Sequence, residues 1–363
     1  MKNIIKNTFA AAAAALAIYY SLKYPYEMGN SIKDSIERCF DVIIPSMFIF
    51  LCLTSYISIS GLHSIIGAPL AKITGRLFRL PEEGIVIFIL SLISGYPAGI
   101  KLVGEGVQSG KLTLHQAKIM SCFCCCGGPA FISGTAAACL YPGSNAALLI
   151  FISVISANVV TALILTRKLE RVSYKADEKR ILNAGAVIPA VRSASSAMLG
   201  MCTMIAAFGG VICILYLSGA IGWLSDIAEL IGISNRSTAE RIIMSFLEIS
   251  NIANLPAMQP SLFPVVSFLL SFGGVCVAMQ IAAIGRNCID IKLFIVSRLF
   301  TAFCSAFISR FLIRFLDIEI SCLKPCVSLY HKGSSPVSSV LLFIMMFMTL
   351  ILIEKQRPEL KKC

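Results

Sequence analysis

Charged side chains are scarce in this sequence. Only 14% of its 363 residues are Asp, Glu, Lys or Arg, whereas 57% are hydrophobic, and the mean hydropathy is +0.84. Soluble proteins carry roughly 25% charged residues, so this chain has too few polar side chains to cover a water-soluble globule. The shortage excludes a soluble domain and indicates an all-α polytopic membrane protein.

The motifs of soluble catalysis and of ATP binding are also absent. The sequence contains no Walker A motif, no HExxH zinc motif, no GxSxG nucleophile motif and no aspartate pair of the intramembrane-protease type. We therefore expect no enzyme and no cofactor. A transporter built from this chain would take its energy from a gradient.

Histidine, a common partner of cysteine in metal sites, is rare beside the 15 cysteines. Four cysteines stand in "SCFCCCGGPAFISG" (121–134), but no second CxxC follows, and the three histidines, His63, His115 and His331, lie elsewhere. Neighbouring cysteines on a helix point in different directions, so they cannot bind one metal together. We expect no metal site and no disulfide framework, only reduced thiols packed at a crowded point.

Long uncharged runs take up most of the chain. A helix of about 20 apolar residues crosses a bilayer, and its backbone groups must be bonded within the segment. We expect helical segments at 4–22, 42–62, 84–101, 119–141, 145–166, 193–217, 239–258, 262–284, 291–316 and 338–353. The first is interpreted as an uncleaved helix.

The net charge of +12 comes from Lys and Arg between these segments. Such clusters are typical of cytoplasmic loops, which favours that reading over nucleic-acid binding. The loop 167–192 carries seven Lys/Arg and three Asp/Glu and should be cytoplasmic, like both termini. Five segments lie between the N-terminus and this loop, so one of them must be re-entrant or broken.

Five segments also follow the loop, and the C-terminus should be cytoplasmic, so one of these segments must be re-entrant or broken as well. The two counts together predict about eight crossings, arranged as two inverted repeats. The chain divides into an N-terminal helix with an external loop (1–41), a first repeat (42–166), the basic loop (167–192), a second repeat (193–316), and a loop with the last helix and tail (317–363). Inverted repeats are common in secondary transporters. In support, "CGGPAFISGTAA" (126–137) resembles "FGGVCVAMQIAA" (272–283).

The first repeat contains a break in "SGYPAGIK" (94–101). Pro97 removes a backbone donor, and the glycines let the chain open or let a neighbour approach. The freed backbone groups should line protein or a watery cavity. Either the break is a binding site in which the lysine attracts an anion, or it is a kink with a snorkelling lysine. The candidate residues are Ser94, Gly95, Tyr96, Pro97, Gly99 and Lys101.

The second repeat has its break in "LEISNIANLP" (247–256). Glu248, Asn251 and Asn254 are three residues apart and should share a helix face. A carboxylate at membrane depth is costly and marks a functional candidate, unless it lies near the headgroups. It would pair with Lys101, carry a proton or hold a cation.

Double glycines complete the set of candidates. They occur in "CCCGGPAFISG" (124–134) and "SFGGVCVAMQ" (271–280), where they allow segments to approach closely. Packing alone would also explain them. The further candidate binding residues are Gly127, Gly128, Pro129, Ser271, Gly273, Gly274 and Gln280.

Together with "IIPSMFIFLCL" (43–53) and "FLEISN" (246–251), these motifs resemble, in order, the sporulation integral membrane proteins of the YlbJ type. These are a branch of the family with the nucleoside-recognition, or Gate, module, and the resemblance covers roughly residues 40–316. The chain departs from it at Cys125, Cys126 and Gly127, where an amide and a serine are expected. The resemblance therefore implies less polar coordination from this segment.

The resemblance implies a transporter of dipicolinate from the mother cell toward the forespore, in the outer forespore membrane of a sporulating bacterium. A small aromatic dianion would suit Lys101, helix N-termini and amide donors. The partners would be the anion and the lipid bilayer, and a homo-oligomer is compatible with the sequence. Two alternatives stay open, namely a nucleoside or metal-ion carrier and a non-transporting membrane scaffold of spore maturation.

Overall fold

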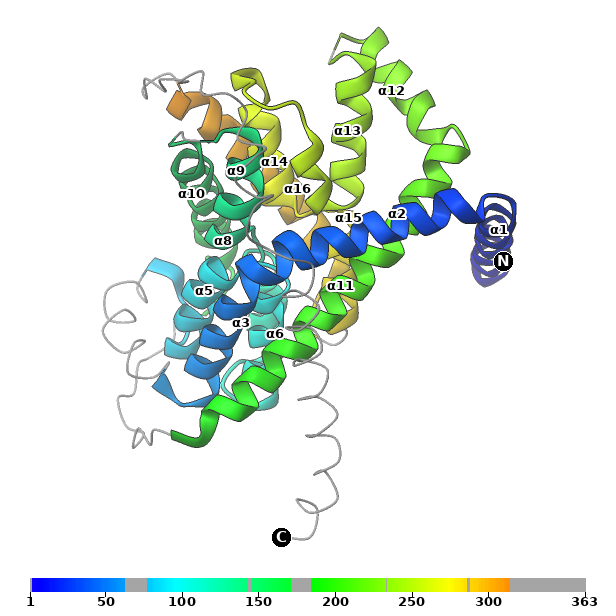
Figure 1. The fold of residues 1–363 in the computed structure, drawn as a ribbon. Helices are drawn as coiled ribbons and strands as arrows, with labels where there is room; N and C mark the ends of the chain where they lie inside the picture. The colour runs from blue at the N-terminus through cyan, green and yellow to red at the C-terminus, as the bar shows by residue number, and fades with distance from the viewer. Residues whose placement is uncertain are drawn as a thin grey trace.

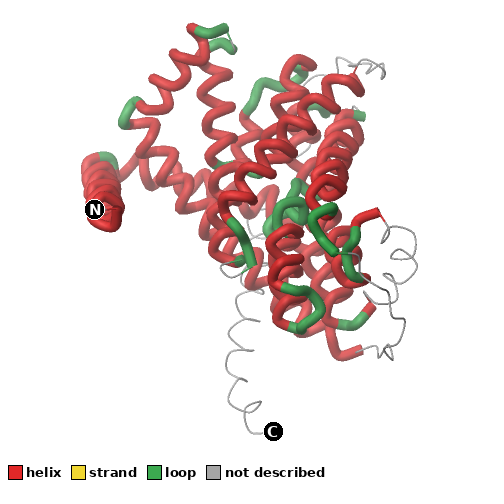
Figure 2. Tube along the Cα trace, turned by 180° about the vertical axis from the view of Figure 1, so that it is seen from behind, coloured by secondary structure: helices red, strands yellow, loops and turns green. Residues whose placement is uncertain are grey.

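The computed structural model describes residues 2–62, 77–142, 145–170, 184–232, 234–285 and 288–313, and within them the chain is helical without strands (Figures 1 and 2). Five helical stretches are long and apolar enough to cross a membrane: Pro25–Ile59, Ala146–Thr166, Val187–Leu217, Pro260–Ile284 and Ile291–Ile313. The chain is therefore a multi-pass integral membrane protein. The remaining predicted segments are shorter or interrupted, and 338–353 lies outside the described residues.

The N-terminal part wraps one side of the bundle. After α1 (Lys2–Lys23), α2 (Pro25–Arg38) continues through the π-helical turn η1 (Cys39–Ile43) into α3 (Ile44–Ile59). The short 3-10 turn η3 (Ala184–Ala186) leads into α11 (Val187–Leu217), which packs along both α2 and α3 (Figure 1). Ser31 Oγ donates to the Gly209 carbonyl at 2.8 Å. The predicted external loop is thus largely the helix α2.

Helix α10 (Ala146–Thr166) defines the two ends of the bundle. Its 21 residues span roughly 30 Å, the thickness of a bilayer core. Beyond its C-terminal end, the carbonyls of Arg167 and Leu169 accept bonds from Arg79 Nη1 at 3.0 and 3.4 Å. Beyond its N-terminal end, Tyr141 Oη donates to the Gln259 carbonyl at 2.9 Å. We call these the basic-loop end and the opposite end.

The segment predicted at 84–101 does not continue across the bundle. Helices α5 (Glu82–Ser94) and α6 (Ala98–Gln108) form a hairpin that starts and ends at the basic-loop end. Lys111 Nζ lies 3.8 Å from Glu83 Oε1 across its open end. The tip is Gly95–Tyr96–Pro97, with a cis Tyr96–Pro97 bond. The first break is therefore the tip of a helical hairpin, not a kink in one continuous helix.

A second hairpin enters from the opposite end. Helix α13 (Arg236–Leu247) runs inward, turns at Glu248, and returns as the 3-10 helix η4 (Ile249–Asn254). Arg241 Nη1 donates to the Asn254 carbonyl at 2.7 Å across the two legs. Met258 N then donates to the Leu140 carbonyl at 2.8 Å, back at the opposite end.

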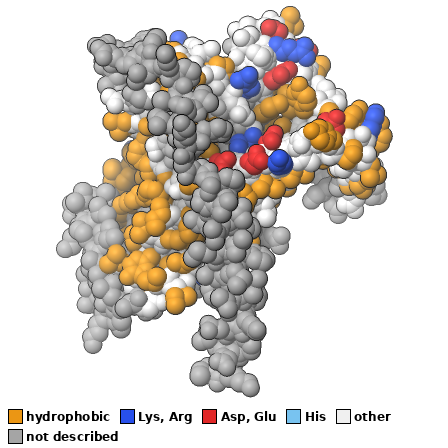
Figure 3. All heavy atoms as spheres, viewed as in Figure 1, with side chains coloured by type: hydrophobic (Ala, Val, Ile, Leu, Met, Phe, Trp, Pro, Cys, Tyr) orange, Lys and Arg blue, Asp and Glu red, His pale blue; other side chains and the backbone are white. Residues whose placement is uncertain are grey.

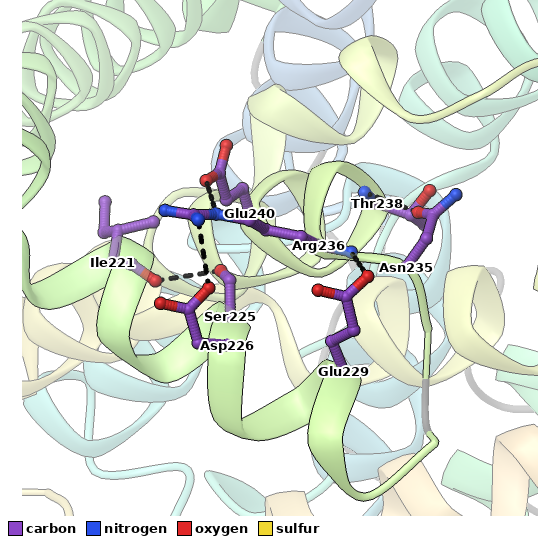
Figure 4. Close-up of polar contacts among 8 residues, drawn as sticks. All are labelled: Ile221, Ser225, Asp226, Glu229, Asn235, Arg236, Thr238 and Glu240. Atoms are coloured by element: carbon purple, nitrogen blue, oxygen red, sulfur yellow. Dashed lines mark hydrogen bonds and ion pairs between the residues drawn. The ribbon is translucent and has the colours of Figure 1, made fainter.

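Helix α12 (Ala220–Leu230) packs on the outer side of α13. Arg236 joins them, because its guanidinium lies 3.2 Å from Asp226 Oδ1 and 3.4 Å from Glu240 Oε1 (Figure 4). Asn235 caps α13 by accepting from Thr238 N at 3.0 Å. In Figure 3, charged side chains gather at this outer end of the hairpin and along α2, whereas apolar side chains cover much of the remaining described surface.

Each half also has a helix that is interrupted near its middle. In the first half, α7 (Leu114–Met120) is followed by a non-helical stretch and then by α8 (Pro129–Phe131), η2 (Ile132–Ala137) and α9 (Ala138–Leu140). In the second half, the 3-10 turn η5 (Pro260–Leu262) leads into α14 (Phe263–Phe272), which Gly273, with φ +89°, separates from α15 (Gly274–Ile284).

The last described helix, α16 (Ile291–Ile313), packs against both α10 and α14. Thr161 and Thr301 share a hydrogen bond of 2.7 Å between their hydroxyls where α10 meets α16. Both threonines are buried, as is Arg298 one turn before Thr301. This crossing forms the polar centre of the bundle.

Candidate functional site

The two hairpin tips and the two helix interruptions meet at one place. Tyr96 N, at the first tip, donates to the Cys126 carbonyl at 2.9 Å. Gly127 N donates to the Leu270 carbonyl at 3.3 Å, which joins the interruption of the first half to that of the second. The backbone groups freed by the breaks are thus partly bonded to one another, as the low polarity of a membrane interior requires.

Glycine is needed at this meeting point because backbones approach closely. A Cβ on Gly95 would lie 2.7 Å from Gly128 N, and Gly95 also has φ +75°. In the second half, a Cβ on Gly274 would lie 3.3 Å from Ile249 N. In each half, therefore, the second glycine of the GG pair lies against the backbone of the hairpin tip. This explains the double glycines by close packing.

A small cavity of about 30 Å³ lies between the tips. Its polar lining comes from both halves, with Tyr96 from the first tip, Glu248 and Ser250 from the second, and Gln280 from α15. The rest of the lining is apolar: Ile43, Met47, Phe131, Met201, Ile205, Ile249 and Val277. The volume is enough for a water molecule and too small for an aromatic solute.

Glu248 is the buried carboxyl of the cavity, with 1% of its surface exposed. It caps η4, and it accepts bonds from Ser250 N at 3.0 Å, from Ser250 Oγ, and from Asn251 Nδ2 at 3.3 Å. The Arg38 guanidinium, at the end of α2, also attracts it. These donors satisfy the oxygens of the carboxylate, whereas its burial works against the negative charge.

Tyr96 supplies an unsatisfied polar group. Its hydroxyl is buried and has no hydrogen-bond partner among the described residues. A Cβ on Gly273 would lie 3.3 Å from its ring, so this glycine makes room for the tyrosine. Gln280 also lines the cavity, and its amide nitrogen Nε2 donates only a weak bond of 3.4 Å to Cys276 Sγ. Both side chains are thus available to bond a solute.

Arg298 is a functional candidate that sequence reasoning missed. It is 1% exposed, and its guanidinium donates to Asn158 Oδ1 at 2.9 Å, to the Cys122 carbonyl at 3.4 Å and to the Ser271 carbonyl. These carbonyls lie where α7 and α14 end, and helix C-termini carry partial negative charge. Arg298 therefore offsets one helix end from each half, while its Nε has no partner among the described residues.

The cysteine run begins beside this cation, which donates to the Cys122 carbonyl. Cys124, Cys125 and Cys126 are fully buried, and a Cβ on Gly99 would lie 2.2 Å from the Cys124 carbonyl. Among the residues that the structure describes, no group of three His, Cys, Asp or Glu side chains could hold a metal ion. The thiols act here as small side chains in a crowded stretch.

Several predicted residues lie away from the cavity. The predicted pairing of Lys101 with Glu248 is wrong, because Lys101 Nζ donates to the Ser193 carbonyl at 3.0 Å and to Ser193 Oγ on α11. Asn254 is exposed and does not join Glu248 and Asn251, because the chain turns at Glu248 instead of continuing as one helix.

The other predicted residues support the backbone of the site. Ser94 Oγ donates to the Leu90 carbonyl at 2.9 Å within α5. Ser271 gives its carbonyl to Arg298, and its hydroxyl is buried without a partner among the described residues. Pro97 and Pro129 stand at the starts of α6 and α8, where a missing amide hydrogen costs no helical bond.

Part of this chain is similar to a curated protein whose name refers to sporulation. Over 129 residues it is 23% identical to the sporulation integral membrane protein YlbJ of Bacillus subtilis (strain 168), a match that covers 36% of this chain and 32% of the relative. The match thus spans about a third of the relative's length. No protein-family model and no solved structure matches the chain.

This similarity supports a YlbJ-like membrane protein with a sporulation-related relative. It agrees with the resemblance of the motifs to YlbJ-type proteins. The presence of a Gate module stays a prediction. The internal geometry of the chain therefore carries the functional argument.

Proposed function

We propose that this protein is a membrane carrier for a small organic anion, with dipicolinate as the first candidate, moved from the mother cell toward the forespore. One observation carries the proposal: two hairpins, entering from opposite ends of the bundle, turn at tips that line a single cavity. Broken and re-entrant segments at membrane depth are a feature of substrate sites in secondary transporters.

The order of elements supports two inverted repeats. Each half consists of a long helix (α3 or α11), a hairpin, an interrupted helix, and a second long helix (α10 or α16). The first hairpin enters from the basic-loop end and the second from the opposite end, so the two halves run in opposite directions. Thr161 and Thr301, from corresponding helices, contact each other directly. Such symmetry would let the site open to either side in turn.

The preference for an anion rests on the donors around the cavity. The N-termini of α6 and α15, each with 11 residues, start at the tip and at Gly273, and helix N-termini attract negative charge. The unpartnered Tyr96 hydroxyl adds a donor, and the buried Arg298 adds a positive charge nearby. Lys101, the residue expected to attract the anion, is engaged elsewhere.

The described conformation is closed to such a substrate. A cavity of about 30 Å³ cannot hold an aromatic diacid, so the tips must separate to admit one. Separation at one end at a time is the population shift that alternating access requires.

The alternatives differ in what they predict for flux. A nucleoside carrier would exchange nucleosides in place of dipicolinate, and a metal-ion carrier would exchange neither. A non-transporting scaffold of spore maturation would show no exchange of any solute. The unsatisfied Tyr96 hydroxyl in a cavity between the halves favours transport over a scaffold role.

The test is counterflow in liposomes that contain the purified full-length chain. Vesicles loaded with unlabelled dipicolinate should accumulate labelled dipicolinate from outside, and vesicles loaded with uridine should not. Equal uptake of labelled dipicolinate into uridine-loaded vesicles would favour the nucleoside carrier. No uptake into either kind of vesicle would contradict the proposal.

A second test addresses location and direction. A fluorescent fusion should mark the outer forespore membrane in sporulating cells, and a deletion strain should make spores low in dipicolinate while the mother-cell pool rises. Normal spore dipicolinate in the deletion strain would refute the assignment of the substrate.

A further inference from the structure

We propose that Glu248 binds one proton together with each substrate anion, so that the carrier is a proton symporter. This inference rests on the proposed function and adds the coupling ion to it. It starts from a conflict at the cavity, where a buried carboxyl lines the same small space that an anion must enter.

The surroundings of Glu248 offer no direct cation to neutralise it. None of the salt bridges between described residues includes it. The charged or titratable groups that face it are Arg38 from α2, Cys39 from η1, Tyr96 from the first tip and Cys276 from α15. Among these described groups only Arg38 is positive, and neither a hydrogen bond nor a salt bridge joins it to the carboxyl.

An arriving anion therefore changes the balance at this carboxyl. Like charges a few ångströms apart in a medium of low dielectric repel each other strongly, and the repulsion favours the neutral, protonated form of a carboxyl. In the closed state the Ser250 and Asn251 donors satisfy the carboxylate. These donors belong to the same tip as Glu248 and stay with it when the tips part, so the opening lets water bring a proton to the carboxyl without removing them.

A metal cation fits this place less well than a proton. The groups that contact Glu248 are an amide N–H, a hydroxyl that donates, and a side-chain amide nitrogen. Hard cations need several oxygen ligands, and the described contacts of Glu248 present donors instead. The cavity of about 30 Å³ needs no enlargement for a proton.

The coupling step is a simple protonation. Hydronium on the side of higher acidity gives its proton to one carboxylate oxygen of Glu248 as the anion binds. When the site opens to the other side, the anion leaves and the carboxylic acid returns its proton to water there. One proton then crosses with each anion, in addition to any proton carried by the substrate itself.

The test uses the full-length chain in liposomes with a trapped pH dye and labelled dipicolinate, at pH values where dipicolinate remains a dianion. Wild-type uptake should be driven by an inward proton gradient and should acidify the lumen by one proton per dipicolinate. Glu248→Gln keeps the shape and the accepting oxygen but cannot titrate. Its residual dipicolinate flux should carry no protons and should lose its dependence on pH.

Glu105→Gln is the matched control. Glu105 lies on α6 outside this cavity and accepts a bond from Ser58 Oγ at 3.4 Å, so this variant should keep the wild-type proton ratio. Wild-type flux without proton movement would overturn the inference while leaving the carrier proposal intact, as would an unchanged ratio in Glu248→Gln. No dipicolinate counterflow in the wild type would contradict the carrier proposal itself. Because the proton count is measured on the wild type, the inference stays testable even if Glu248→Gln does not fold.

Discussion

At the scale of single residues, Gly99 shows how tightly the first hairpin is packed. A Cβ there would lie 2.2 Å from the Cys124 carbonyl and 2.6 Å from Ser91 Cβ, both of which belong to rigid neighbours. Gly99→Ala should therefore destabilise the protein by about 3 kcal/mol, the upper end of overpacking costs. Thermal unfolding in detergent, followed by size-exclusion chromatography, measures the loss.

Gly104, on the same helix, provides the control. A Cβ there meets nothing within 4 Å, so Gly104→Ala should be neutral or stabilise the protein by up to about 1 kcal/mol through the higher helix propensity of alanine. Equal loss in both variants would show that α6 does not pack against the cysteine run as described.

Arg298 leads to a second prediction at this scale. Its bond to Asn158 Oδ1 is buried and has a charged donor, and such bonds contribute about 1.5–3 kcal/mol. A double-mutant cycle with Arg298→Met and Asn158→Leu should give a coupling energy above roughly 0.6 kcal/mol, the average for hydrogen bonds between membrane helices. The free energies come from unfolding of the four proteins. Additive effects would mean that the guanidinium is held by the carbonyls alone.

The contrast between Glu248 and Arg298 shows what the sequence can predict about the site. Glu248 was predicted because it stands in a long apolar stretch beside a proline-containing break. Arg298 stands near Lys292 and Arg310 in α16, and so it reads as one of several charges at a membrane boundary. Its burial depends on Asn158 and Ser271, residues far away in the chain. No local pattern carries that information.

At the scale of elements, the positions of the helices were more predictable than their paths. The helices at 145–166, 193–217 and 291–316 were predicted close to their observed bounds. In the sequence, the segment at 84–101 forms one apolar run, yet in the structure it holds one leg and the tip of a hairpin. Pro97 permits either a kink or a reversal, and the choice depends on Gly99 and Gly106, which let the second leg pack back on the first.

The contact between α10 and α16 leads to the prediction at this scale. Thr161 and Thr301 lie hydroxyl to hydroxyl at 2.7 Å on helices that pack closely. After replacement of the native cysteines, Thr161→Cys and Thr301→Cys together should crosslink with copper phenanthroline. We expect the crosslinked protein to keep most of its dipicolinate counterflow, because the hairpin tips, not this crossing, must move.

Gel mobility without reductant reports the crosslink, and each single-cysteine protein is the control. Loss of counterflow on crosslinking, restored by reductant, would mean that α10 and α16 slide past each other during transport.

At the scale of the whole molecule, the two hairpins predict which loops share a side of the membrane. Ser109 follows the first hairpin at the basic-loop end, and Gln259 lies at the opposite end, and both are exposed. In a cysteine-free background, Gln259→Cys should react with an impermeant maleimide in intact cells. Ser109→Cys should react only after the membrane is opened, because the basic loop is expected in the cytoplasm.

Labelling of both positions from the same side would contradict the re-entrant fold of α5 and α6. If α5 alone crossed the membrane, Ser109 would lie on the opposite side from the basic loop. A cysteine placed in the loop 167–192 therefore serves as the reference for that side.

The bond from Gly127 N to the Leu270 carbonyl has a consequence for how the chain is made. When the ribosome has produced the first 166 residues, the tip can already bond through Tyr96 N to the Cys126 carbonyl, but Gly127 N still lacks its partner, the Leu270 carbonyl. Until about a hundred further residues are synthesised, this amide must remain in contact with water or with the insertion machinery. The first half therefore cannot complete its membrane integration alone, and the two halves become mature together, at a late stage of biogenesis.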